Sequence, residues 1–411
     1  MPPGISLGTQ MILVLIPTPY CAKGSINAVQ THLRKSIFIG ETYSEMMSIR
    51  ELDVLLEEIE IDNVRIRNRF VRSATHEWLA AEDGTISHEI MGIYERLAEN
   101  HIGLIISGYS HVTKCGKSSR AQQGIWDDIM ISGYYQVAET VRRFESAFFI
   151  QIAHGGRHGL ITEDCPQSMA PSSVPLPGSN AMPKEMSSGE IDSVIDDFAR
   201  ATERAAKAKV DGVQIHCAHG YLLSSFLSPY TNRREDDWGG DTERRTRIVV
   251  EILRRSRKLA PGLAIAVKMN AWDGVEGGID KREAVRIARI LDSEGISAIE
   301  VSGGIEDAPH EITCTEDIDS EDKEAYFREH SRAIKEAVDC PVILVGGNRS
   351  IVNMSRMISE GYADLVALSR PLIREPDLIS KFMSGDARTA SCISCNGCFD
   401  ETGIKCNIKR D

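Results

Sequence analysis

The sequence predicts a (β/α)8 TIM barrel that is followed by a short cysteine-rich C-terminal segment. Beyond residue 60, short β-rich apolar runs alternate with longer amphipathic helical patterns, and the runs number eight. Runs of this kind, bounded by Gly, Pro or Ser, are typical of parallel strands buried on both faces, and eight such strand–helix units close naturally into a barrel. The alternative, a doubly wound open sheet, is disfavoured because no Gly-x-Gly-x-x-Gly opens the first unit.

The expected elements follow in order along the chain. The eight strands are predicted over residues 69–73, 102–106, 147–152, 211–215, 263–267, 298–301, 342–345 and 365–368. The clearest helical patterns between them cover residues 190–209, 243–258, 281–293 and 324–338. Asp241 is a suitable N-cap for the second of these helices, because its side chain can accept a hydrogen bond from the first turn.

The 411 residues fit one barrel with extensions at both ends. We expect a poorly structured N-terminal extension over residues 1–45, the barrel over residues 46–390 and the cysteine-rich segment over residues 391–411. An apolar run at residues 11–16 is too short to span a bilayer, has no basic stretch before it and is followed by Pro17 and Pro19. The extension is therefore predicted to be neither a signal peptide nor a membrane anchor.

The formal net charge is −13, and Lys and Arg are scattered through the predicted helices. Nucleic acids and anionic membranes reward clustered positive charge, so neither is expected as a partner; we expect a small-molecule substrate and a homo-oligomer. Six cysteines are dispersed, most of them in apolar or small-residue settings that are typical of reduced, buried thiols. They are Cys21, Cys115, Cys165, Cys217, Cys314 and Cys340. This pattern favours a reducing, cytoplasmic setting.

Polar and glycine residues follow every predicted strand, where a barrel carries its catalytic groups. Gly346, Gly347 and Asn348 follow the seventh strand, and Ser369 and Arg370 follow the eighth. Together they offer closely approachable backbone N–H groups and a cation, which suits a phosphate. Ordinary turn glycines beside a surface arginine are the alternative.

His216, His219 and Tyr221 follow the fourth strand. The His-x-x-His spacing fits a metal pair, two satisfied buried histidines, or two groups that bond one substrate oxygen. A metal site is disfavoured, because the sequence offers no third ligand nearby.

Several long motifs resemble the old yellow enzyme family, the NADH:flavin oxidoreductases. They lie at residues 68–75 (NRFVRSAT), 151–157 (QIAHGGR) and 211–223 (DGVQIHCAHGYLL). The resemblance extends over residues 55–384, and several long motifs in the right order make it specific. It implies that the barrel binds FMN at the carboxyl ends of its strands and takes electrons from NADH or NADPH.

The resemblance also implies a set of flavin-binding residues at the strand ends. One edge of the isoalloxazine ring would lie along Ser73, Ala74 and Thr75, with Thr75 near C4=O. Further contacts to the ring or its pyrimidine edge would come from Gly108, Tyr109, Gln151 and Gly303.

Lys268 departs from the family pattern, since many members carry Arg at this strand end, facing flavin N1 and C2=O. Lysine keeps the positive charge that stabilises an anionic reduced flavin but gives up the planar, two-pronged donor. Asn270 and Asp273 nearby suggest the subgroup that resembles 2,4-dienoyl-CoA reductases. A plain ion pair inside the barrel is the alternative.

The implied chemistry is hydride transfer from NADH or NADPH through FMN to an activated alkene. His216 and His219 would bond one substrate carbonyl oxygen and stabilise enolate charge, and Tyr221 would donate a proton to the adjacent carbon. Two alternatives are a demethylase-like oxidase acting on an amine or ether, and a flavin/iron–sulfur electron carrier that serves a redox partner protein.

Cys392, Cys395, Cys398 and Cys406 have the spacing Cys-x2-Cys-x2-Cys-x7-Cys. Four thiolates this dense suggest a metal or an iron–sulfur cluster. The pattern resembles the cluster loop of trimethylamine dehydrogenase and 2,4-dienoyl-CoA reductase, with a shorter last gap. We therefore predict a [4Fe–4S] cluster; a vestigial, empty loop and structural zinc are the alternatives.

Overall fold

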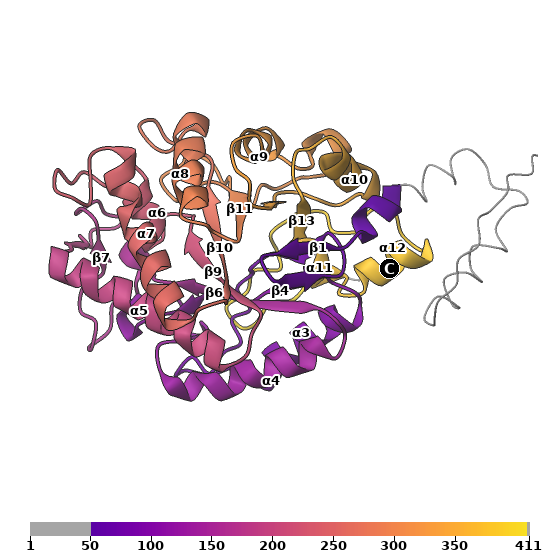
Figure 1. Ribbon diagram of the computed structural model, residues 1–411, viewed down its shortest axis with the longest axis horizontal. Coiled ribbons are helices and arrows are strands. Elements are labelled where there is room, and N and C mark those ends of the chain that lie inside the picture. The colour runs from indigo at the N-terminus through magenta and orange to yellow at the C-terminus, as the bar shows by residue number, and fades with distance from the viewer. Residues whose placement is uncertain (1–50, 409–411) are drawn as a thin grey trace, which may run out of the picture. The chain divides into compact units, whose positions relative to one another are not determined.

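Eight parallel strands close into a ring in the computed structural model, which describes residues 51–408 (Figure 1). Each strand pairs with the next, and β13 pairs with β3, so the predicted barrel is confirmed and an open sheet is excluded. The strands are β3 Phe70–Arg72, β4 Leu104–Ile106, β6 Ala147–Ala153, β9 Gly212–Cys217, β10 Ala264–Asn270, β11 Ala298–Ser302, β12 Val342–Leu344 and β13 Leu365–Leu368. The predictions for residues 1–45 lie outside the described residues.

Helices surround the ring of strands (Figure 1). They are α3 His88–Glu99, α4 Ile131–Arg142, α5 Ser188–Lys207, α7 Thr242–Leu259, α8 Lys281–Ser293, α9 Arg328–Lys335, α10 Ile351–Ser359 and α12 Leu378–Ser384, with the short α6 Leu222–Leu227 and α11 Arg370–Arg374 in loops. Asp241 caps α7 as predicted, since its side chain accepts from the Arg244 N–H. The helix predicted over residues 324–338 is shorter. The Glu324 carboxylate instead accepts from the N–H groups of Arg349 and Ser350, and α9 begins only at Arg328.

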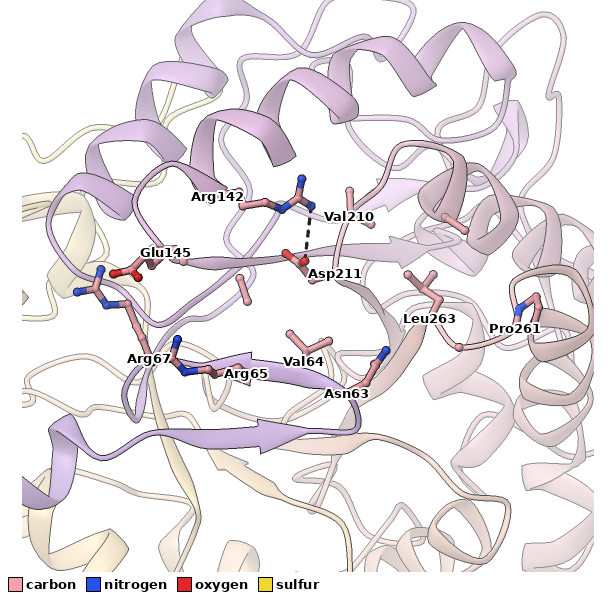
Figure 2. A pocket seen from close by; sticks show the side chains of 14 residues that line it. Asn63, Val64, Arg65, Arg67, Arg142, Glu145, Val210, Asp211, Pro261 and Leu263 are labelled. Carbon is pink, nitrogen blue, oxygen red and sulfur yellow. Dashed lines mark ion pairs between the residues drawn. The ribbon is translucent and has the colours of Figure 1, made fainter. Parts of the chain in front are cut away.

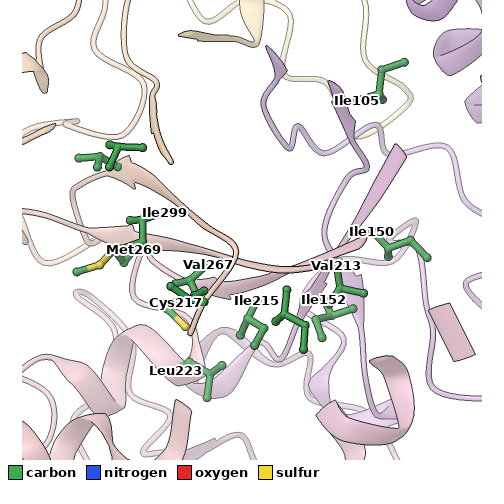
Figure 3. Close-up of a cluster of buried hydrophobic side chains, with 14 of the residues drawn as sticks. Ile105, Ile150, Ile152, Val213, Ile215, Cys217, Leu223, Val267, Met269 and Ile299 are labelled. Atoms are coloured by element: carbon green, nitrogen blue, oxygen red, sulfur yellow. The ribbon is translucent and has the colours of Figure 1, made fainter. Parts of the chain in front are cut away.

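Successive side chains of a strand point to opposite faces, and this alternation divides the core into two parts. Outward-facing residues of the strands pack under the helices (Figure 3), among them Val213, Ile215 and Val267. The inward-facing residues near the amino ends form a separate apolar cluster, which includes Phe149, Ala266 and Ile343. The inward positions nearer the carboxyl ends carry polar side chains, and these form the site described below.

A hairpin of β1 Ile59–Ile61 and β2 Val64–Ile66 adds Ile61 and Ile66 to the apolar cluster inside the barrel. A cavity of about 570 Å³ lies beside this hairpin and is lined by Arg65, Arg142 and Asp211 among others (Figure 2). Because it is at the amino ends of the strands, it is not the place where a barrel carries its active site.

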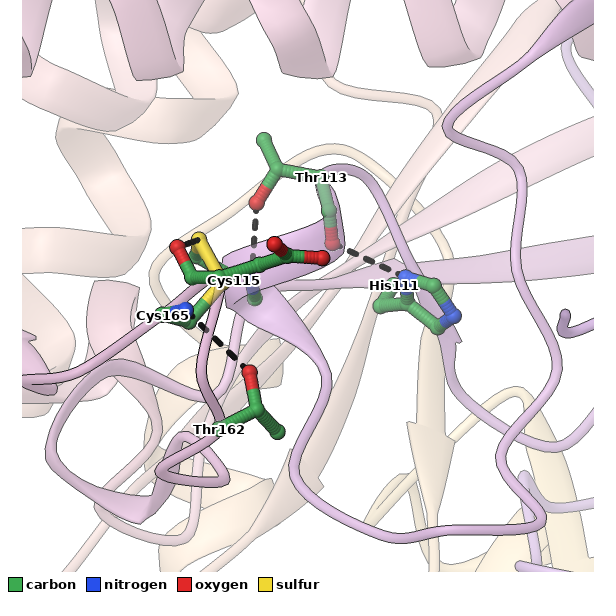
Figure 4. The surroundings of a disulfide bond; sticks show 7 residues. His111, Thr113, Cys115, Thr162 and Cys165 are labelled. Carbon is green, nitrogen blue, oxygen red and sulfur yellow. Dashed lines mark hydrogen bonds between the residues drawn. A yellow bond between two sulfur atoms is a disulfide. The ribbon is translucent and has the colours of Figure 1, made fainter. Parts of the chain in front are cut away.

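The prediction of reduced thiols is wrong for Cys115 and Cys165, which form a disulfide with their Cα atoms 5.4 Å apart (Figure 4). Fifty positions separate them in sequence, but they lie in the loops that follow β5 Ser110–His111 and β6. Spacing along the chain does not reveal that two barrel loops adjoin, which is why the pair was missed. Cys217 and Cys340 are free and buried, as predicted, and Cys314 is free and half-buried.

Between residues 51 and 408, none of the helices has the length and apolar character needed to cross a bilayer.

Two buried imidazoles lie in the same loop region as the disulfide. His111 Nδ1 is 2.9 Å from the Thr113 carbonyl oxygen, and His154 Nδ1 accepts from the Gly156 N–H at 3.0 Å. Burial lowers the pKa of each ring to about 4, so both are neutral at pH 7.

We predict that replacing Gly212 by Ala destabilises the barrel. A Cβ at this inward position of β9 would lie 2.7 Å from the Phe149 ring and 2.8 Å from the Ala264 carbonyl oxygen. Overpacking of this kind costs about 1–3 kcal/mol, so the urea midpoint should fall. The matched control is Gly189→Ala in α5, where nothing lies within 4 Å of the added atom. Equal midpoints for the two variants would contradict the packing described here.

We also predict that stability falls as the pH drops from about 6.5 towards 4. The folded-state pKa of His154 is about 4 and the ordinary value is 6.5, so in this range the unfolded chain binds the proton and the folded chain does not. Between pH 7.5 and 5, this one residue should account for about 2 kcal/mol. Urea titrations at both pH values should show a smaller loss for His154→Gln than for the unchanged protein. Replacing the exposed His310 by Gln should leave the loss as it was; equal losses in both variants would refute the assignment.

Candidate active site

A continuous row of buried polar side chains crosses the carboxyl end of the barrel. Gln151 Nε2 donates to Gln214 Oε1 at 2.7 Å, and Gln214 Nε2 donates to Glu300 Oε2 at 2.7 Å. Glu300 Oε1 accepts from the Ser73 hydroxyl at 2.5 Å and lies 3.1 Å from Lys268 Nζ. The row joins five side chains, each from a different strand or strand end. Three of them, Ser73, Gln151 and Lys268, were predicted to face the flavin.

Glu300 was not predicted as a site residue, although it is fully buried at the centre of this row. A signal was present in the sequence: within the run at residues 298–301, Glu300 is a charged residue among three apolar ones. A buried carboxylate needs partners to be tolerated, and Glu300 has three.

The structure brings His216, His219 and Tyr221 together. The His216 ring centroid lies 5.2 Å from that of His219 and 4.9 Å from that of Tyr221. His219 Nε2 is 2.8 Å from the Ser302 hydroxyl, whereas His216 Nδ1 is buried without a hydrogen-bond partner among the described residues. Burial and the nearby Lys268 lower the pKa of His216 to about 3 and that of His219 well below its usual value, so both rings are neutral.

Tyr221 belongs to an aromatic group at the rim of the site. Its ring centroid lies 5.3 Å from that of Tyr109 and 4.9 Å from that of His158. Burial raises the pKa of Tyr221 well above 10, so the phenol keeps its proton at neutral pH. Ser118 donates to the Tyr109 hydroxyl at 3.3 Å and helps to hold this group in place.

His76 was also missed, although it follows the predicted Ser73–Thr75 edge directly. Its ring lies 4.9 Å from Tyr109, and its Nε2 is buried without a partner among the described residues. The Thr75 hydroxyl, in contrast, is already satisfied by the Ser73 carbonyl oxygen and the Ser369 hydroxyl. Of these neighbours, His76 therefore has the free hydrogen-bonding atom that a ligand at the barrel mouth could meet.

Gly108 and Tyr109, which were predicted to contact the flavin ring, are held by a buried network of hydrogen bonds. The Gly108 N–H donates to the Tyr94 hydroxyl at 3.0 Å, and a Cβ at Gly108 would collide with the Glu77 carboxylate. Glu77 in turn pairs with Arg72 at 2.7 Å. This buried network holds the backbone that carries Tyr109.

The predicted phosphate-binding residues lie at adjoining strand ends, after β12 and β13. Gly346 and Gly347 have φ values of 120° and 74°, and the Tyr326 ring packs so closely on both that a Cβ would meet it at 2.9–3.0 Å. This close packing alone explains why both positions are glycine, so their part in phosphate binding stays a prediction. Asn348 donates its amide to the Leu344 and Ala367 carbonyl oxygens, while its Oδ1 is buried and unpartnered within residues 51–408.

Arg370 faces the C-terminal segment as well as the barrel mouth. Its Nη1 donates to the Asn396 side-chain oxygen at 2.7 Å and to the Ser394 carbonyl oxygen at 3.2 Å. The predicted Gly303 directly follows β11, and a Cβ there would meet the Phe327 ring at 2.7 Å. A buried cation, left-handed glycines and orphaned polar atoms at one end of the barrel fit FMN.

The loops after β6 and β11 meet above the site. Arg157 and Asp307 form a bidentate, almost fully buried ion pair between them. The Pro- and Ser-rich residues 173–179, in the loop after β6, line a cavity of about 540 Å³ together with Tyr230 and Arg233. These two long loops therefore bound the approach to the aromatic group.

The four C-terminal cysteines line one small cavity of about 30 Å³. Ser394 and Asn396, which flank Cys395, have left-handed φ values of 57° and 55°, and they turn the loop at this cysteine. Arg374 Nη1 lies 3.4 Å from Cys406 Sγ, and burial raises the pKa of Cys398 to about 11. Within residues 51–408, no three Cys, His, Asp or Glu side chains converge closely enough to hold a single metal ion.

Comparison with known proteins places this chain in a family. The NADH:flavin oxidoreductase / NADH oxidase family matches residues 54–388. An NADH oxidase of Thermoanaerobacter brockii is 36% identical over 365 residues, which cover 86% of this chain and 55% of that protein. An NADPH dehydrogenase of Clostridium acetobutylicum is 33% identical over 325 residues, which cover 78% of this chain and 92% of that protein.

The chain thus spans about half the length of the first of these relatives and most of the second. Among solved structures, a 2-naphthoyl-CoA reductase superposes with a TM-score of 0.79 at 23% identity, covering 84% of this chain and 54% of that one, which supports the fold. The chain belongs to the NADH:flavin oxidoreductase / NADH oxidase family, which confirms the resemblance to old yellow enzymes and makes it an FMN-dependent oxidoreductase.

Proposed function

We propose that the enzyme takes a hydride from NADH or NADPH and passes it to an alkene that is activated by an adjacent carbonyl group. FMN supplies the hydride-accepting and hydride-donating chemistry when it is bound. The observation that carries the proposal is the convergence of two neutral imidazoles and one protonated phenol above a buried lysine.

The two histidines are suited to hold a carbonyl oxygen. His216 Nδ1 is buried and has no hydrogen-bond partner among residues 51–408, so in the tautomer protonated at this atom it would donate to an incoming oxygen. His219 is oriented by Ser302 at 2.8 Å, which leaves its other ring nitrogen for the same oxygen. Neutral donors in a dry site can stabilise developing enolate charge without first losing a proton to it.

Tyr221 is suited to supply the proton. Its raised pKa keeps the phenol protonated, and its contact with Tyr109 fixes the ring beside His216. The proton would move from the Tyr221 hydroxyl to the carbon next to the polarised carbonyl group, and Ser118 and Tyr109 lie within the same hydrogen-bonded group to re-supply it.

We predict that the histidine variants separate the two half-reactions. His216→Ala and His219→Ala should slow reoxidation by a simple enone about a hundredfold, because enolate charge develops only in that step. Reduction by NADH or NADPH should change far less. Tyr221→Phe should slow reoxidation while enone binding persists. Stopped-flow absorbance of the flavin measures both steps.

The control for the half-reaction experiment is His101→Ala, a histidine near the amino end of β4 and away from the site. It should leave both half-reactions unchanged. Equal, small effects of the three site variants on the two steps would remove these residues from the catalytic group.

We further propose that the four C-terminal cysteines bind a [4Fe–4S] cluster that exchanges single electrons with a partner protein. The observation in its favour is that all four line one cavity beside Arg370 and Arg374, whose charges suit thiolates. Ile404 N–H donates to the Glu77 carbonyl oxygen at 2.9 Å, so the stretch that returns to Cys406 is attached to the barrel.

Protein prepared without oxygen should contain about four iron and four sulfide per FMN. Cys395→Ser should lower the iron content, because it removes a ligand that is exposed and needs no repacking. Cys340→Ser should leave the iron content unchanged, because Cys340 does not line this cavity. Well under one iron per chain in the unchanged protein with full FMN would identify the segment as a vestigial loop.

A further inference from the structure

We propose that Glu300 is a positioning residue that sets the reduction potential of the bound FMN by holding Lys268 and offsetting its charge. The inference deepens the proposed function, since it rests on the placement of the FMN pyrimidine ring beside Lys268. It assigns a role to a carboxylate that neither the sequence motifs nor the catalytic group accounts for.

The register of the barrel forces these two residues together. Lys268 of β10 and Glu300 of β11 are direct partners across parallel strands, and His216 of β9 is the partner of Lys268 on the other side. All three point into the barrel, because their neighbours along the same strands, such as Val267 and Ile299, point outward and pack under the helices. The ion pair therefore lies one strand away from the proposed oxyanion donors.

Hydrogen bonds fix the pair in one geometry. Lys268 Nζ lies 3.1 Å from Glu300 Oε1 and donates to the Ser73 hydroxyl at 2.9 Å. The same hydroxyl donates to Glu300 Oε1 at 2.5 Å, and Gln214 occupies Oε2 at 2.7 Å. Both carboxylate oxygens are thus engaged, and the side chains of Lys268 and Glu300 are 5% and 0% exposed, so solvent screens them little.

The consequence for the flavin is electrostatic. A two-electron-reduced flavin gains negative charge on its pyrimidine side, which an unpaired cation there would stabilise strongly. With Glu300 at 3.1 Å, the pair presents a dipole in place of a net charge, so the reduced form gains less. The potential is then lower, and the reduced flavin is a stronger hydride donor, than with Lys268 alone.

The test is the FMN reduction potential, measured by equilibrium reduction against a reference dye. Glu300→Gln should favour reduced over oxidised FMN by at least about tenfold, which is ~30 mV upward for a two-electron couple. Lys268→Met should shift the potential downward. The double variant should lie near the unchanged protein, because the pair is removed as a unit.

Two further variants keep the test decisive. Glu300→Asp retains the charge but draws it away from Lys268, so the potential should rise by less than in Glu300→Gln. If Glu300→Gln does not fold, this variant decides: a rise supports the proposal and an unchanged potential overturns it. Glu283→Gln is the matched control, since Glu283 forms a buried ion pair with Arg245 between α7 and α8, and it should leave the potential unchanged.

The outcomes separate the two levels of inference. If Lys268→Met lowers the potential and Glu300→Gln does not raise it, the role of Glu300 is refuted while the flavin placement stands. If neither variant shifts the potential, the flavin does not lie beside this row, and the placement fails together with the proposal.

Discussion

The alternation of inward and outward side chains on parallel strands is the constraint on which the rest of this structure depends. Near the amino ends, the inward positions carry residues such as Phe149 and Ala266, and the barrel is solid. Two residues further along the same strands, those positions carry Gln151 and Lys268. Burial of polar groups at that depth is costly unless they have partners, and the row from Gln151 to Lys268 meets this cost because its members bond to one another.

Sequence reasoning found the features that depend on local patterns. The eight apolar runs, the Asp241 cap and the polar residues at each strand end are visible within a few residues of one another, and the structure bears out the strands and the cap. The disulfide between Cys115 and Cys165 depends on which loops adjoin, and the partnership of Glu300 with Lys268 depends on strand register. Neither the contact between two loops nor the register between two strands can be predicted from the sequence of a single strand.

The group of His216, His219 and Tyr221 shows how burial assigns chemical roles. The same desolvation that keeps both imidazoles uncharged keeps the phenol protonated, so one environment yields two hydrogen-bonding groups and one acid. Lys268 contributes to the low pKa of both rings, which links the charge beneath the site to the protonation of the groups above it. The predicted residues were found by motif, but their protonation states follow from depth.

The attachment of the cysteine segment depends on closure of the barrel. Its anchors include the Glu77 carbonyl oxygen, in the loop after the first barrel strand, and Arg370, directly after the last. These loops are neighbours only once β13 has paired with β3, which is the step that closes the ring. The arrangement in which all four thiols line one cavity therefore depends on the same strand pairing that closes the barrel.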